Sequence, residues 1–236
     1  MLSPTREPVA VQERVRQTLE RGVQIDLSTE PCKRFLRRHV NSKVAVGILY
    51  VDIDGSTKMS MSLPAPKFAL MLQIFSQEMS LLISEFGGYP LKYVGDAVIA
   101  LFPGQHNGVQ TSKSALDCAA EMQQIVRTSI NPEFKSHSLP EIKIKVSLEY
   151  GELLVVLYGK SIERSHIDIV GPSISMAAKM LSLAHSDNIM MGNSIYSKLA
   201  SDKSGKYRFS EVRTTPAEWS YQDEKHGGRY KLYQLE

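Results

Sequence analysis

The fold is decided by residues 43–57, which read KVAVGILYVDIDGST. Val44 to Val51 form a nearly continuous apolar run, which is typical of a central strand buried on both faces. The run ends in Asp52 and Asp54, and a small Gly-Ser-Thr turn then leads toward a helix. The segment therefore predicts a core strand that delivers carboxylates and a glycine turn to one edge of a sheet.

The rest of the chain alternates between helical and extended patterns. Apolar residues at three- to four-residue spacing indicate helices, and apolar runs indicate strands. Gly95-Asp96 is typical of a hairpin turn. Asn131-Pro132 is expected to stop a helix. Residues 142–148 are expected to form a strand with one face exposed to water. The order predicts an α+β sandwich with helices on one side of a mostly antiparallel sheet. The expected helices are 66–86, 112–130, 172–184 and 192–200, and the further strands are 89–94, 97–102, 142–148, 153–157, 167–170, 208–212 and 230–235.

Residues 1–43 differ in pattern and are expected to form an N-terminal helical arm ahead of a domain over 44–236. Apolar residues at four-residue spacing predict an amphipathic helix over about 9–25. The basic stretch from Lys33 to Arg38 is interpreted as a solvated helix face, with Phe35 and Leu36 packed inward. A segment that binds a membrane surface or a partner is the alternative for this stretch.

Composition excludes several classes of protein. The 236 residues are 42% apolar and 22% charged, which is ordinary for a globular protein and not for a disordered or fibrous one. A net charge of +3 lacks the basic excess of a dedicated nucleic-acid binder, so none is expected as a partner. No apolar run approaches the ~18 residues of an integral membrane segment. The two cysteines, Cys32 and Cys118, favour buried thiols in the cytoplasm over a disulfide or zinc site.

Acidic and small polar residues mark three candidate sites. Asp52 and Asp54 are hard oxygen ligands suited to Mg²⁺ or Mn²⁺, and the turn after them exposes N–H groups that a phosphate needs. Asp96 lies in the hairpin turn and can share a metal pair with Asp52 if the hairpin lies beside that strand. Asp168 ends a strand, and Ser175 and Lys179 share one face of the next helix. Taken singly, these residues are also ordinary strand-end, turn and surface residues.

Together the three segments resemble the catalytic domain of class III adenylate and guanylate cyclases. The family's first metal motif is similar to Asp52-Ile53-Asp54-Gly55-Ser56-Thr57, and its hairpin motif is similar to Lys92-Tyr93-Val94-Gly95-Asp96. Its third motif is similar to the segment from Ile167-Asp168 to Lys179-Met180. The motifs occur in the family's order over about 44–235, and the chain resembles most the short stand-alone prokaryotic members. The implied architecture is the ferredoxin-like, palm-type sandwich.

The resemblance implies a role for each matched residue. Asp52 and Asp96, with the Ile53 carbonyl, would hold two Mg²⁺ or Mn²⁺ ions. The triphosphate would lie on the backbone of Asp54, Gly55, Ser56 and Thr57. Lys92 and Asp168 match the pair that reads a purine, and lysine is the adenine-type choice. The transition-state arginine falls on Lys179, the ribose-orienting asparagine on Ser175, one phosphate-binding cation on or near Arg164, and another on Lys225 or Arg229.

The resemblance implies an enzyme that converts a nucleoside triphosphate, ATP by this reading, to the 3′,5′-cyclic monophosphate and pyrophosphate. Because all paired roles occur in one chain, the implied assembly is a homodimer with two equivalent sites. Two other readings stay open. One is a pyrimidine cyclase that makes cyclic UMP or cyclic CMP in phage defence, although Lys92 and Asp168 favour a purine. The other is an inactive nucleotide-binding or dimerisation module, which the replacements at Ser175 and Lys179 allow and the intact Asp52 and Asp96 oppose. A diguanylate cyclase is disfavoured because residues 94–98 do not read Gly-Gly-Asp-Glu-Phe.

Overall fold

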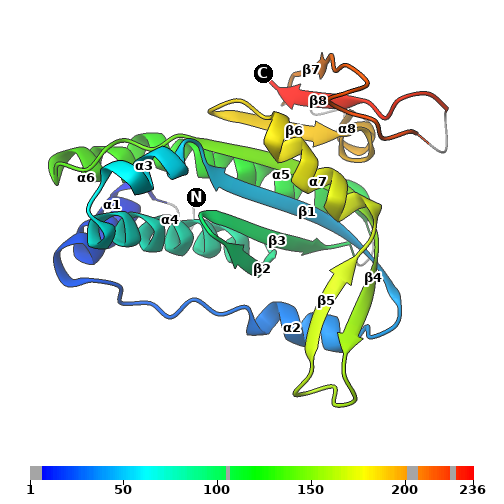
Figure 1. The fold of residues 1–236 in the computed structure, drawn as a ribbon, viewed down its shortest axis with the longest axis horizontal. Helices are drawn as coiled ribbons and strands as arrows, with labels where there is room; N and C mark the ends of the chain where they lie inside the picture. Colours follow the sequence, from blue (N-terminus) through cyan, green and yellow to red (C-terminus); the bar gives the residue numbers. More distant parts are fainter. Residues whose placement is uncertain (1–6, 105–106, 201–206, 224–226) are drawn as a thin grey trace.

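One mixed sheet organises the part of the chain that the computed structural model describes, residues 7–104, 107–200, 207–223 and 227–236. The strand order is β2-β3-β1-β4-β6-β8-β7, and β5 pairs with β4 off this path (Figure 1). Every pairing is antiparallel except that of β4 with β6. The strands are β1 Lys43–Ile53, β2 Tyr89–Val94, β3 Ala97–Pro103, β4 Ile144–Tyr158, β5 His166–Val170, β6 Asn188–Gly192, β7 Phe209–Val212 and β8 Leu232–Leu235.

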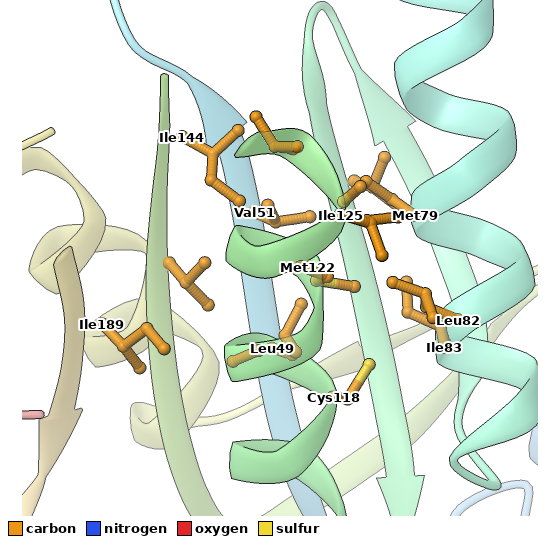
Figure 2. Close-up of a cluster of buried hydrophobic side chains, with 14 of the residues drawn as sticks. Leu49, Val51, Met79, Leu82, Ile83, Cys118, Met122, Ile125, Ile144 and Ile189 are labelled. Atoms are coloured by element: carbon orange, nitrogen blue, oxygen red, sulfur yellow. The ribbon is translucent and has the colours of Figure 1, made fainter. Parts of the chain in front are cut away.

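Helices cover both faces of this sheet, which corrects the expectation of helices on one side. Alternate residues of β1 point to two separate cores: Leu49 and Val51 pack against α4 and α5 (Figure 2), whereas Val46 and Ile48 pack against α2 and α7. The reason is the apolar run itself, because a strand without polar alternation needs cover on both sides. The palm-type α+β architecture is confirmed. The helices are α1 Pro8–Arg21, α2 Glu30–Arg37, α3 Ser56–Ser62, α4 Ala65–Glu85, α5 Gly108–Ile125, α6 Asn131–Ser136, α7 Pro172–Leu183 and α8 Asn193–Ala200.

Strand β4 is a single long element where the sequence predicted two strands. Ser147, expected on a face open to water, is fully buried, and its hydroxyl donates to the Ala177 carbonyl of α7 at 2.7 Å. Glu149, two residues on, is buried as well. The wet face is confirmed at Lys143, which is exposed, but was wrong at Ser147, because α7 packs over this part of β4 and a local alternation cannot report which helix will cover it.

The helix predicted to stop at Asn131-Pro132 does not stop there. After α5 the chain makes a π-helical turn over Val126–Ile130 and continues directly into α6. Pro132 is tolerated because it lies in the first turn of α6, where a backbone N–H has no helical partner. The Asn131 side chain instead pairs with the Ile142 backbone, donating to its carbonyl at 2.9 Å and accepting from its N–H at 2.8 Å.

Both helices of the N-terminal segment pack on the sheet domain. Val11 and Val15 of α1 are fully buried beside α4, and Arg14 pairs with the buried Glu78 at 2.6 Å. In α2, Phe35 and Leu36 face inward as predicted. Helix α1 ends at Arg21, earlier than expected, because Gly22 has a φ of +79° and an extended ψ that take the chain out of the helix.

Two further expectations concern membranes and thiols. Cys32 and Cys118 are both free and buried, as predicted. Within the described ranges, no helix combines the length and apolarity that crossing a bilayer requires.

Candidate active site

Asp52 and Asp96 meet at one end of the sheet, as the sequence predicted. Val51 of β1 pairs with Val98 of β3, which brings the β2–β3 turn that carries Asp96 beside the end of β1. Burial and the adjoining Asp96 carboxyl raise the pKa of Asp52 to about 7. The Asp96 Oδ2 atom is shut off from solvent and has no hydrogen-bond partner among the described residues.

This pair has the chemistry of a divalent cation site. Two carboxylates that crowd each other, one with a buried unpaired oxygen, are stabilised by a hard cation such as Mg²⁺ or Mn²⁺. The site rests on this pair of carboxylates, because no group of three or more His, Cys, Asp or Glu side chains that could hold a metal occurs in the described ranges, here or elsewhere. Ile53, the last residue of β1, lies next to Asp52, and its role as a carbonyl ligand stays a prediction.

The turn after β1 is shaped by Gly55 and leads into α3, a short helix that the sequence did not predict. Gly55 has a φ of +74°, a conformation that side chains with a Cβ rarely adopt. Ser56 and Thr57 open α3, where N–H groups have no partner within the helix. The Asp54 N–H is different, because it donates to the Lys143 carbonyl at 2.8 Å. Of the predicted phosphate-binding amides, only those of residues 55–57 are therefore candidates in this structure.

Lys145 is a site residue that sequence reasoning missed. Its Nζ atom lies 3.8 Å from Asp52 Oδ2 and 3.3 Å from Asp54 Oδ1, and its side chain is 19% exposed. A hydrogen bond from Ser186 and the ammonium of Lys145 lower the pKa of Asp54. The signal was the antiparallel register, in which Asp52 lies directly opposite Lys145, but that register is a property of the sheet and not of either strand alone.

Lys92 and Asp168 form the second predicted pair. Lys92 Nζ donates to Asp168 Oδ2 at 2.7 Å across the gap between β2 and β5. His166 lies 3.9 Å from the same oxygen. Cys32 of α2 lies behind this pair, and burial together with the Asp168 charge raises its pKa to about 12. Tyr50 is also a neighbour, because burial and then Asp168 raise its pKa to about 12.

The remaining predicted residues are exposed on other elements. Ser175 and Lys179 lie one turn apart on the solvent side of α7, and Ser175 donates to the Gly171 carbonyl at 3.4 Å. Arg164 is exposed in the turn between β4 and β5. Arg229 donates to the Thr214 carbonyl. Lys225 lies outside the described residues. Among the contacts described for the single chain, none joins these residues to Asp52 or Asp96.

Comparison with known proteins identifies the family that has this arrangement. The family model of the adenylate and guanylate cyclase catalytic domain matches residues 39–235. The chain belongs to this family. Within the cyclase family, the solved structure of the adenylyl cyclase CyaB from P. aeruginosa superposes with a TM-score of 0.69 at 18% identity, covering 83% of this chain and 95% of that one. This likeness shows the shared fold.

Two curated cyclases illustrate the range of relatives. The cytidylate cyclase of Escherichia coli is 28% identical over 159 residues, covering 64% of this chain and 34% of that protein. The uridylate cyclase of Burkholderia cepacia is 27% identical over 188 residues, covering 79% of each chain. This cyclase domain thus spans about a third of the cytidylate cyclases that it matches and most of the uridylate cyclase.

Proposed function

We propose that the protein is an active nucleotidyl cyclase that converts a nucleoside triphosphate to its 3′,5′-cyclic monophosphate and pyrophosphate. The observation that carries the proposal is the convergence of Asp52 and the unpaired Asp96 carboxylate at the end of β1, beside the Gly55 turn. An inactive module would have no need for two crowded carboxylates, because their repulsion destabilises the fold unless a cation offsets it.

Each residue of this end of the sheet has a defined task in the proposed reaction. Asp52 and Asp96, with the Ile53 carbonyl, would hold two divalent ions, which when bound acidify the attacking 3′-hydroxyl and neutralise the leaving pyrophosphate. The amides of residues 55–57 bind the triphosphate. Lys145, through its contacts with Asp52 and Asp54, supplies a positive charge beside the phosphates.

The other half of the site comes, in this proposal, from a second copy of the chain. Lys179 and Ser175 are exposed on α7 and Arg164 on the β4–β5 turn, so they are free to contact a nucleotide held by a partner. Lys179 then stabilises charge on the α-phosphate, Ser175 orients the ribose, and Arg164 and Arg229 bind phosphate. A two-fold symmetric homodimer would contain two such sites.

Two base classes remain as candidates for the substrate, each with its own support. The Lys92–Asp168 pair at 2.7 Å supports ATP, because it offers one donor and one acceptor of the kind that an adenine edge requires. The uridylate cyclase matched over 79% of both chains supports a pyrimidine triphosphate, and the cytidylate cyclase match supports the same class. The reaction is the same for both; only the base differs.

One experiment tests the function and separates these candidates. The purified protein is incubated with Mn²⁺ and, in turn, ATP, GTP, CTP and UTP, and the products are separated by chromatography. We expect one cyclic monophosphate to predominate, with pyrophosphate in equal amount, and an Asp96→Asn variant to form none. A folded wild-type protein that cyclises no triphosphate would refute the proposal in favour of an inactive module.

A further inference from the structure

A cavity of about 850 Å³ lies beside the Asp54–Gly55 turn, walled by α3, the π-helical turn, and the segment that leads into β4. Met59 and Leu63 of α3 form one apolar wall, and Val126 and Ile142 form the opposite one. Cavities of this volume accommodate small organic ligands. The proposed reaction uses the Gly55 turn at the edge of this space and leaves the rest of the cavity without a role.

This cavity adjoins the candidate active site at the Asp54–Gly55 turn but does not include the Asp52–Asp96 pair. Side chains of a strand alternate between faces, so Asp52 points away from the side that Val51 and Ile53 share. Val51 and Ile53 belong to the core that also contains Val126 and Ile142, and the cavity opens on that side. Neither Asp96 nor Lys145 lines it. The two sites therefore meet at the Asp54–Gly55 turn, and the Asp52–Asp96 pair lies outside the cavity lining.

Hydrogen bonds hold the walls of the cavity in place. The side chain of Asn131 makes two hydrogen bonds to the Ile142 backbone, which fixes the π-helical turn to the start of β4. The Asp54 N–H donates to the Lys143 carbonyl at 2.8 Å, which fixes the turn after β1 to the same segment. A preformed cavity costs a ligand little ordering free energy. π-helical turns are, moreover, often found at functional sites.

Two cations at the rim of the cavity offer contacts to an anion. Lys58 and Arg127 are exposed at its rim, and neither forms an ion pair with another described residue. The acids at the rim are mostly engaged: Asp54 contacts Ser186 and Lys145, and Asp187 lies 3.7 Å from Lys143. Glu141 is the remaining acid of the lining. The lining as a whole has three cations and three carboxylates and is neutral, but Lys58 and Arg127 remain open to an anionic ligand.

Gln123 adds an unmet hydrogen bond in the same wall. This residue lines the cavity, and its Nε2 atom is shut off from solvent without a partner among the described residues. An unsatisfied buried donor destabilises the fold, and a hydrogen bond from this amide to a ligand acceptor, after rotation of the side chain, offsets that cost. Apolar walls, two rim cations outside the described ion pairs and an unpaired amide together define the chemistry of the occupant.

We propose that this cavity is a second ligand site, which binds an amphipathic anion with an apolar body against Met59 and Leu63 and an anionic head at Lys58 and Arg127. The assignment stands on the cavity alone and does not depend on turnover. Its place behind the Asp54–Gly55 turn makes an occupant a direct neighbour of the proposed triphosphate-binding segment.

The test uses the fluorescent amphipathic anion 1-anilinonaphthalene-8-sulfonate, whose emission rises in an apolar site. We expect saturable binding of one probe per chain to the full-length protein, and displacement by decanoate but much less by decanol, which lacks the charge. Arg127→Glu should weaken probe affinity at least fivefold, and Leu63→Trp, which fills the cavity, should abolish saturable binding. Lys135→Glu, at an exposed position of α6 outside the cavity, should leave the affinity unchanged.

Two results would overturn the proposal. One is an Arg127→Glu variant that is folded by circular dichroism and binds the probe as tightly as the wild type does. The other is complete competitive displacement of the probe by Mg·ATP, because the probe would then occupy the active site. Arg127 is exposed, so its variant tests the site even if Leu63→Trp fails to fold. Because the readout is binding, failure here leaves the cyclase proposal untouched.

Discussion

Replacing the buried Glu149 by glutamine should change how the stability of the protein depends on pH. Glu149 is fully buried in β4, and its carboxyl accepts hydrogen bonds from the Tyr230 hydroxyl at 3.0 Å and from the Tyr150 N–H at 2.8 Å. Burial raises the pKa of Glu149 from 4.5 to about 8, although these hydrogen bonds and the charge of Lys198 oppose the shift. At neutral pH the native protein therefore holds this carboxyl protonated.

The sign and size of the effect follow from linkage. Between pH 4.5 and 8 the unfolded chain releases the Glu149 proton while the native state retains it, so the contribution of Glu149 to stability is full below pH 4.5 and is lost as the pH rises toward 8. At about 1.4 kcal/mol per pKa unit the full loss is at most about 5 kcal/mol. Glutamine keeps the shape of the side chain but does not titrate. The free energy of unfolding of Glu149→Gln minus that of the wild type should therefore rise by at least about 2 kcal/mol from pH 5 to pH 8.5.

Urea unfolding at pH 5, 7 and 8.5 measures this difference, with the free energy of unfolding extrapolated to water. Glu152→Gln is the matched control, because Glu152 lies on the same strand but is exposed, and its difference from the wild type should vary little across this range. Parallel pH dependence of wild-type and Glu149→Gln stability would refute the reasoning, since it would mean that Glu149 titrates alike in the folded and unfolded states.

The remaining predictions concern the proposed activity. Asp52→Ala or Asp96→Ala should abolish cyclic nucleotide formation, while thermal unfolding should show no loss of stability because one of two crowded carboxylates is gone; near wild-type turnover at saturating Mn²⁺ in either variant would contradict the metal assignment. Mixing Asp52→Ala with Lys92→Ala protein should restore activity through heterodimers that contain one intact site, and no recovery despite demonstrated subunit exchange would exclude a site shared between chains. Lys179→Ala should lower turnover at least tenfold, which is ~1.4 kcal/mol of barrier, whereas Lys179→Arg should preserve or raise it, tested also with Ser175→Asn to steer the longer side chain. An active Lys179→Ala variant would make Lys179 a surface lysine.

The sequence by itself determined the central strand and the hairpin with its Gly95-Asp96 turn. It also determined most of the helices. The apolar run of residues 44–51 has no polar face, so only a doubly buried strand satisfies it, and β1 is such a strand. The adjacency of Asp52 and Asp96 was predictable too, because a hairpin paired with β1 carries its turn to the strand's end. The family followed from the order of the three motifs.

Other features were decided only by tertiary structure. Ser147 looks like a residue facing water until α7 covers it. Whether the helix before Pro132 ends or continues depends on the segment of the same chain that packs beside it. Here the Asn131 side chain makes two hydrogen bonds to the Ile142 backbone, and the helix continues. In each case the local pattern was compatible with both outcomes.

Lys145 shows most clearly why the local sequence was not sufficient. Nothing local distinguishes it from Lys143, since both are lysines on the same side of an alternating strand. The register of β4 against β1 places Lys145 opposite Asp52 and leaves Lys143 at the rim of the cavity. A side-chain period reports which face a residue takes, but pairing partners distant in sequence are chosen by the packing of the whole sheet, and that choice sets which lysine belongs to the site.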